Sequence, residues 1–223
     1  MKNLKNRVFS LIFILFLMIT INGCATNTII KMPLNKDISE LNFDNKGIAI
    51  LSLTISNIFK VKFQPEVWSL GIVEITDLGE INYQRFTTEE VYESVKEQYN
   101  KYLISFKLSP GKYKLTGING GAKYFLIFGS FNFPINFEFE LNTNKITYIG
   151  SIEMINRKKK DGEPSSGPDF PIVDQVVSGF ANGTFDIKVS DNYNYDIKAF
   201  NEKYPYIINS DVVKNIIKIN GSD

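Results

Sequence analysis

The stretch KYLISFKLSPGKYKLTG, from Lys101 to Gly117, is the clearest indicator of the fold. Apolar and polar residues alternate on both sides of a turn signal at Ser109–Gly111. One face of the two runs is apolar, with Tyr102, Ile104, Phe106, Leu108, Tyr113 and Leu115. The other face is polar, with Lys101, Ser105, Lys107, Lys112, Lys114 and Thr116. A period of two is typical of β-strands with one buried and one solvated face. We therefore expect two strands joined by a turn, with Tyr113 buried and its hydroxyl hydrogen bonded.

Similar runs follow one another along the rest of the chain. They cover residues 66–75, 80–86, 135–141, 145–154 and 184–189, and residues 47–56 are apolar on both faces, as in a central strand. The Asn119–Gly121 tripeptide predicts a tight hairpin turn, and residues 123–129 after it a buried strand. Many short strands separated by turn signals favour a mostly-β fold. We expect an antiparallel β-sandwich with a few short peripheral helices, including one at the C-terminus.

Three segments have helical spacing or capping. Thr87 and Glu90 form a capping box before residues 91–99. Residues 194–204 have apolar side chains along one helical stripe, and Pro205 would end this helix. Residues 210–219 follow the same spacing and begin with Ser210, a favourable N-cap. We expect each to be a short helix docked on a sheet, because short helices do not persist alone.

The N-terminus has the organisation of a secretory leader. A basic head of Lys2, Lys5 and Arg7 precedes an apolar run from Val8 to Ile21, and the only cysteine, Cys24, follows. The run is shorter than the roughly 20 apolar residues that span a bilayer. These features predict a signal peptide, with a retained anchor helix as the alternative.

The residues Ile21-Asn22-Gly23-Cys24 resemble the lipobox of bacterial lipoproteins, in which a small residue precedes the cysteine. Asn22 departs from the small or hydroxyl residue usual at its position. The resemblance implies cleavage before Cys24, attachment of lipid to Cys24, and a membrane-anchored place in the cell envelope. Since Ala25 follows, it implies the outer membrane where a cell has two. The expected organisation is a signal peptide over 1–23, a lipidated tether over 24–46 and one β-sandwich domain with C-terminal helices over 47–223.

Composition excludes several kinds of chemistry. The chain contains no histidine and its formal net charge is +1. The absence of histidine removes histidine-based acid–base catalysis and histidine metal sites. The charge balance offers no basic excess for nucleic acid. We expect no cofactor, no metal and no catalytic residue.

The Pro110–Leu115 strand start, followed later by Tyr148-Ile149-Gly150, resembles a group of uncharacterised bacterial lipoproteins. Similar hairpins occur in prealbumin-like and carboxypeptidase-regulatory-like β-sandwiches. The resemblance implies a fold and transfers no catalytic residue.

Three groups of residues are candidate sites. Glu138 and Glu140 share one strand face, where they are either a carboxylate pair or a solvated face opposite Lys112 or Lys114. The loop 157–171 begins with a basic run and continues with Asp, Glu, Gly, Pro and Ser, so it is a mobile surface loop, a calcium site or a contact for anionic lipid. Four aromatic residues form either a sugar or peptide platform or part of the core: Trp68, Tyr193, Tyr195 and Tyr206.

Together these patterns predict a lipid-anchored, non-catalytic β-sandwich that binds or scaffolds an envelope protein or glycan. The alternative is an envelope carbohydrate-binding module or a hydrolase that uses carboxylates.

Overall fold

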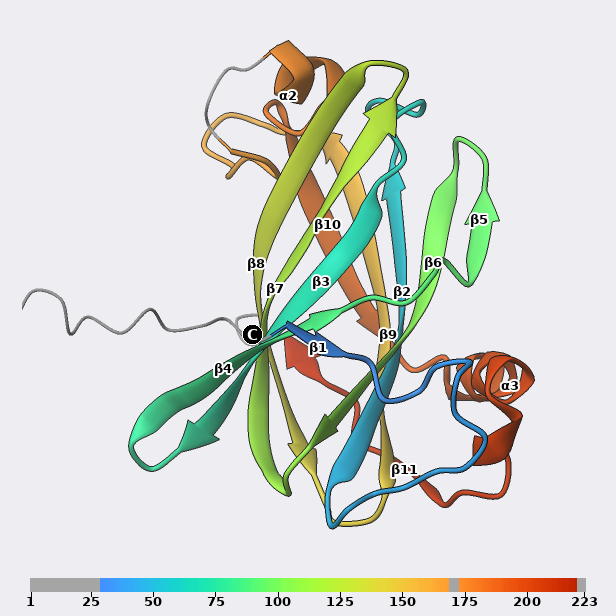
Figure 1. Ribbon diagram of the computed structural model, residues 1–223. Helices are drawn as coiled ribbons and strands as arrows, with labels where there is room; N and C mark the ends of the chain where they lie inside the picture. The colour runs from blue at the N-terminus through green and yellow to red at the C-terminus, as the bar shows by residue number, and fades with distance from the viewer. Residues whose placement is uncertain (1–28, 169–172, 220–223) are drawn as a thin grey trace, which may run out of the picture.

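The computed structural model describes residues 29–168 and 173–219, and these form a mostly-β sandwich of two facing sheets (Figure 1). The predicted fold class is confirmed. The leader, the lipobox and Cys24 lie outside the described residues.

The sheet that we call sheet A has the strand order β1-β4-β3-β7-β8-β12. Its strands are β1 (Ile29–Lys31), β3 (Glu66–Thr76), β4 (Gly79–Thr87), β7 (Gly111–Tyr124), β8 (Ile127–Leu141) and β12 (Lys218–Ile219). Sheet B has the order β10-β9-β2-β6-β5, and β11 also pairs with β9. Its strands are β2 (Gly47–Asn57), β5 (Glu93–Val95), β6 (Tyr99–Leu108), β9 (Ile146–Lys158), β10 (Gly183–Ser190) and β11 (Val212–Lys214). Most pairs are antiparallel, but β1 with β4, β2 with β9 and β11 with β9 are parallel, so both sheets are mixed.

The main core lies between the two sheets and contains the apolar face predicted around Lys101–Gly117. Tyr113 is 1% exposed, its hydroxyl donates to the Ser109 carbonyl at 2.9 Å, and its ring stacks on Phe139. The prediction for Tyr113 is confirmed. The turn at Ser109–Gly111 is also present, but it carries the chain from β6 in sheet B to β7 in sheet A.

The outer face of sheet B is covered (Figure 1). Helix α3 (Tyr193–Lys203), the 3₁₀ turn η1 (Pro205–Ile207) and part of residues 32–43 pack on it and form a second apolar cluster. The central strand β2 therefore contributes to both clusters, as predicted for residues 47–56. Lys101 and Ser105, expected on a wet face, are buried instead.

A buried ion pair holds α3 against this face. The Asp196 carboxylate, on the first turn of α3, accepts from the Lys101 ammonium at 3.1 Å, from the Ser52 hydroxyl at 2.6 Å and from the Tyr148 hydroxyl at 2.7 Å. Because a buried carboxylate needs partners for its charge, these donors fix where the helix docks.

The segment expected to be a tether over 24–46 is folded from Ile29 onward. β1 pairs with β4 of sheet A, and Met32 and Leu34 are buried. The Leu34 amide donates to the Ser105 hydroxyl at 3.2 Å, so this segment closes one side of sheet B.

Of the three expected helices, only the one over 194–204 is present, as α3. The prediction of a helix over 87–99 is wrong. That stretch contains the end of β4 and the short strand β5, which pairs with β6. The helix expected over 210–219 is also wrong. Residues 212–214, which include the β-branched Val212 and Val213, form β11 beside β9, where packing outweighs the weak helical pattern. A second short helix, α2 (Val173–Ser178), lies at one end of the sandwich against β8.

A candidate binding hollow on the open face of sheet A

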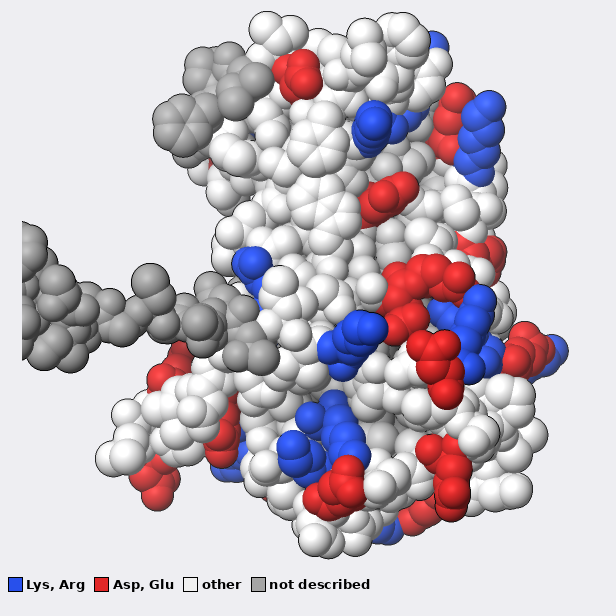
Figure 2. Space-filling model, in the orientation of Figure 1, with Lys and Arg blue, Asp and Glu red and all other residues white. Residues whose placement is uncertain are grey.

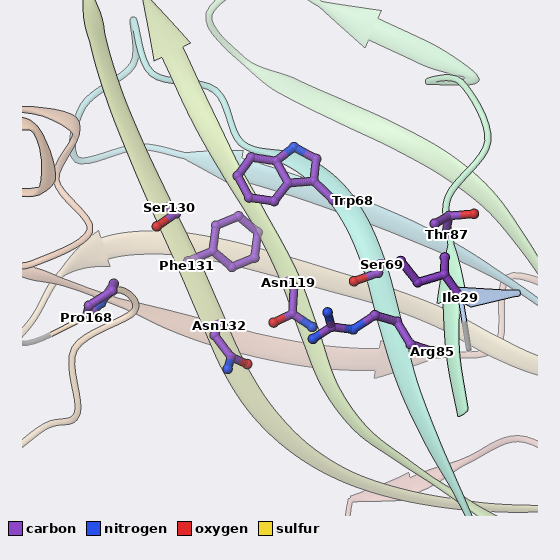
Figure 3. Close-up of a pocket in the computed structure, with 10 residues that line it drawn as sticks. All are labelled: Ile29, Trp68, Ser69, Arg85, Thr87, Asn119, Ser130, Phe131, Asn132 and Pro168. Carbon is purple, nitrogen blue, oxygen red and sulfur yellow. The ribbon is translucent and has the colours of Figure 1, made fainter. Parts of the chain in front are cut away.

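The outer face of sheet A carries a hollow of about 450 Å³ (Figure 3). Its lining residues come from β1, β3, β4, β7 and β8 and from the loop before α2, and they are Ile29, Trp68, Ser69, Arg85, Thr87, Asn119, Ser130, Phe131, Asn132 and Pro168. We call it the sheet A hollow. Unlike the outer face of sheet B, this surface is not closed over by a helix in the described part of the chain.

The floor of the hollow is a row of short polar side chains that runs across four strands. Thr87 of β4 pairs with Ser69 of β3, Ser69 pairs with Asn119 of β7, and Asn119 pairs with Asn132 of β8. Cross-strand neighbours on one face lie roughly 5 Å apart at their Cβ atoms. The row therefore presents hydroxyl and amide groups at close, regular intervals.

A β-bulge places Trp68 beside this row. Val67 pairs with Gly120 and Ser69 pairs with Asn119, so Trp68 is the extra residue of β3. A bulge redirects a side chain out of the normal alternation. Val67 thus packs in the core, whereas the indole of Trp68 lies on the outer face and is 41% exposed.

Three hydrogen bonds hold the bulge in place. The Val67 amide donates to the Tyr102 hydroxyl at 3.0 Å, and the Thr88 hydroxyl donates to the Val67 carbonyl at 2.5 Å. The Thr88 amide donates to the Trp68 carbonyl at 3.0 Å. Burial raises the pKa of Tyr102 to about 12, from an ordinary value near 10. The position of Trp68 is set by the fold before any ligand arrives.

The predicted hairpin turn at Asn119–Gly121 is wrong, because these residues lie within β7 under the hollow. A Cβ on Gly120 would come within 2.5 Å of the Phe131 ring in the core, and a Cβ on Gly121 within 2.6 Å of the Trp68 indole outside. The two glycines are therefore needed for close approach on both faces of the strand. The real turn falls at Phe125–Leu126, inside the segment 123–129 expected to be a buried strand.

Trp68 packs against a second exposed aromatic side chain. Its ring is parallel to that of Phe128 on β8, with 3° between the planes and 5.7 Å between the centroids. Phe128 is 46% exposed. The pair forms an exposed aromatic wall at one side of the polar row.

Arg85 lies at the other side of the row, with its guanidinium near the Asn119 amide (Figure 3). Its Nε atom is buried and has no hydrogen-bond partner among the described residues. An unpaired buried donor costs free energy that a ligand acceptor would recover. The guanidinium matches a carboxylate or phosphate group, and the two asparagines can donate to and accept from hydroxyls.

The carboxylate pair Glu138 and Glu140 lies elsewhere on sheet A. Both are exposed on β8, opposite Lys114 and Lys112 respectively, which confirms the solvated-face interpretation. They line a smaller hollow of about 200 Å³ with Lys112, Phe139 and Asn215.

The four aromatic residues considered as one platform are not brought together. Trp68 is on sheet A, whereas Tyr193, Tyr195 and Tyr206 are on α3 and η1 over sheet B. Lys101 Nζ lies 4.2 Å from the Tyr195 ring centroid, and the Tyr206 hydroxyl donates to the Asn35 carbonyl at 3.1 Å. Tyr193 and Tyr206 thus pack within the segments that cover sheet B, whereas Tyr195 is 61% exposed.

In the described part of the loop 157–171, Glu163 forms an ion pair with Arg157. Its two carboxylate oxygens accept from the Arg157 guanidinium at 2.7 and 2.8 Å, which lowers the pKa of Glu163 to about 2. Among the residues that the structure describes, no group of three or more Asp, Glu, Cys or His side chains could hold a metal ion. Asp169 lies outside the described residues.

No family model, curated protein or solved structure matches the chain. Within residues 29–168 and 173–219, no helix combines the length and apolarity needed to span a bilayer.

Sequence reasoning named Trp68 but missed Arg85, Asn119, Asn132 and Ser130. One signal could have pointed to them: two adjacent glycines in a run long enough to be a strand indicate close approach of another group.

Proposed function

We propose that the protein is a lipid-anchored envelope protein that binds a carbohydrate, without transforming it, in the sheet A hollow. The observation that carries this proposal is the combination of the Trp68–Phe128 wall with the row of amides and the unpaired Arg85 donor. An aromatic face suits the apolar face of a sugar ring, and amides suit its hydroxyls.

Arg85 makes the proposal more specific. A guanidinium binds a carboxylate through two parallel hydrogen bonds, which a neutral sugar cannot offer. The expected ligand class is therefore an oligosaccharide with uronic acid or another carboxylate-bearing sugar.

The single tryptophan provides the test, because Trp68 is the only one in the chain. Its fluorescence should change on titration with uronic-acid oligosaccharides, and less with neutral hexose or N-acetylated amino-sugar oligosaccharides. Arg85→Gln should weaken uronic-acid binding about tenfold or more, as loss of a hydrogen bond to a charged group does.

Lys112→Gln is the matched control, since Lys112 lies on the same sheet but outside the hollow. It should leave the titration unchanged. If none of the three sugar classes alters the Trp68 emission, the proposed function is wrong.

Anchoring is a separate part of the proposal and is supported by the lipobox resemblance around Cys24. Cys24→Ser should abolish fatty-acid labelling and block removal of the leader. A Ser variant that is still labelled would contradict lipid attachment at this residue.

A further inference from the structure

One end of the sandwich, which we call the apolar end, exposes large apolar side chains. It consists of the β7–β8 turn, the β2–β3 loop and α2. Phe125 is 81% exposed, Leu126 80%, Val173 70% and Ile58 63%. Further exposed apolar residues of the same segments are Val61, Tyr124, Val176 and Val177. Isolated exposed apolar residues are ordinary, but a contiguous group of this size marks an interaction surface.

The three segments are packed into one unit. Phe63 of the β2–β3 loop contacts the Tyr124 ring edge-on at 5.7 Å. The Asn57 amide donates to the Ser178 carbonyl of α2 at 3.1 Å, and the Phe128 amide donates to the Asp174 carboxylate at 3.1 Å. Figure 1 shows the β7–β8 turn and α2 together at the top of the molecule, and Figure 2 shows mostly uncharged atoms there.

The β7–β8 turn, which forms the tip of the apolar end, has an unusual sequence for its backbone conformation. Phe125 has φ of +56° in a two-residue connection between β7 and β8. Such hairpin turns favour Asn-Gly, because a bulky residue at positive φ is strained. An exposed Phe-Leu pair in this position is costly for folding, which points to a use for the pair outside the folded core.

Lysines surround the apolar end. Lys60 and Lys62 belong to the β2–β3 loop, and Lys123 precedes the tip. The ammonium groups of Lys60 and Lys62 lie over the rings of Phe59 and Tyr124. The basic run 158–160 lines a shared hollow with Phe59. Of the nearby acids, Glu163 is paired with Arg157 and Asp174 accepts from the Phe128 amide, while Asp161 lines the same hollow as the basic run.

We infer that the apolar end is a membrane-contact surface that inserts Phe125 and Leu126 between lipids with anionic headgroups. Aromatic and aliphatic side chains at a convex tip suit the interface of a bilayer, and the surrounding lysines complement its negative charge. This surface contains none of the residues that line the sheet A hollow, and it would give the protein a reversible membrane contact in addition to the lipid proposed on Cys24.

The test uses the full chain with Cys24→Ser, so that no native thiol or lipid remains. A polarity-sensitive fluorophore is attached at Leu126→Cys or, as the matched control, at Leu78→Cys. Leu78 is 91% exposed in the connection between β3 and β4. Because both proteins keep the same N-terminus, binding through the leader affects them equally.

With vesicles of phosphatidylglycerol and phosphatidylcholine in equal parts, emission at position 126 should shift to the blue and rise severalfold, whereas emission at position 78 should not. Vesicles of phosphatidylcholine alone should give a weaker response. Each of Lys60→Gln, Lys62→Gln and Lys123→Gln should weaken the partitioning about fivefold at low salt.

Three results would overturn the inference. The first is an equal response at positions 126 and 78. The second is no dependence on anionic lipid or on the lysines. The third is a response at position 126 that appears without vesicles and grows with protein concentration, which would show that a second copy of the chain covers this surface.

Discussion

The outer faces of the two sheets differ in what lies on them. On sheet B, α3, η1 and part of residues 32–43 cover apolar and polar side chains, including the Lys101–Asp196 pair. On sheet A, Trp68 and Phe128 stay exposed beside a row of amides and hydroxyls. The covered face uses its polar groups to fix a helix, whereas the open face leaves the Arg85 Nε without a partner among the described residues.

In this sandwich, structural polar groups have partners within the fold, whereas functional ones face a hollow without them. Asp196 has three donors within the fold, so its removal should affect stability. The polar side chains that line the sheet A hollow lie on its outer face and outside the core, so their removal should affect binding.

The largest effect is expected for Asp196→Ala. This change leaves Lys101, whose side chain is 9% exposed, as an uncompensated buried charge. It should cost about 3–5 kcal/mol of the free energy of unfolding, measured by urea denaturation. Asp211→Ala removes an exposed ion pair with Lys145 and should cost less than about 1 kcal/mol. Equal losses in the two variants would show that the covered face does not depend on the buried pair.

Gly121→Ala should disturb the open face with a smaller loss of stability. The new Cβ would lie 2.5 Å from the Gly129 carbonyl oxygen and 2.6 Å from the Trp68 ring. We expect a loss of about 1–3 kcal/mol from overpacking, together with a changed Trp68 emission spectrum. A variant with native stability and native fluorescence would mean that Trp68 does not lie over β7.

Tyr102→Phe tests the support of the bulge. Loss of the hydroxyl that accepts from the Val67 amide should cost about 1 kcal/mol at neutral pH. Burial raises the pKa of Tyr102 to about 12 in the folded protein, whereas the unfolded pKa is about 10. Its contribution to stability is therefore fully present below pH 10 and is lost as the pH rises toward 12. Stability measured across this range should fall less steeply in Tyr102→Phe than in the parent protein.

The smallest effect is expected for Glu138→Gln combined with Glu140→Gln. Both residues lie on the open face but outside the sheet A hollow. Stability should change by about 0.5 kcal/mol or less, as is usual for surface changes, and sugar binding should not change. Loss of a cellular phenotype in this variant would favour the carboxylate-based alternative.

The sandwich could be predicted from sequence because alternation reports directly which side chains meet the core. Tyr113 is buried as its place in the alternating pattern requires. The same pattern could not show whether the second face of a strand meets water or another segment. Lys101 and Ser105 were therefore expected to be exposed to solvent, although α3 and the segment before β2 bury them.

Predictions of turns from local residue types failed at the candidate sites for a related reason. Gly120 and Gly121 after Asn119 would ordinarily indicate a turn, but here the two glycines allow Phe131 and Trp68 to approach the strand. Phe125 and Leu126 read as strand residues, yet they form the tip of the hairpin. The register across β4, β3, β7 and β8, which brings Arg85 near Asn119, depends on long-range pairing that no local pattern contains.

The most direct test of the contrast between the two faces is a map of amide and side-chain NMR shifts during titration with a uronic-acid oligosaccharide. We expect shifts at the Trp68 indole N–H, the Asn119 and Asn132 side-chain amides and the Arg85 guanidinium, with the signals of α3 unchanged. Shifts centred on α3 and η1, or no shifts at saturating sugar, would contradict the claim that the open face of sheet A is the binding surface.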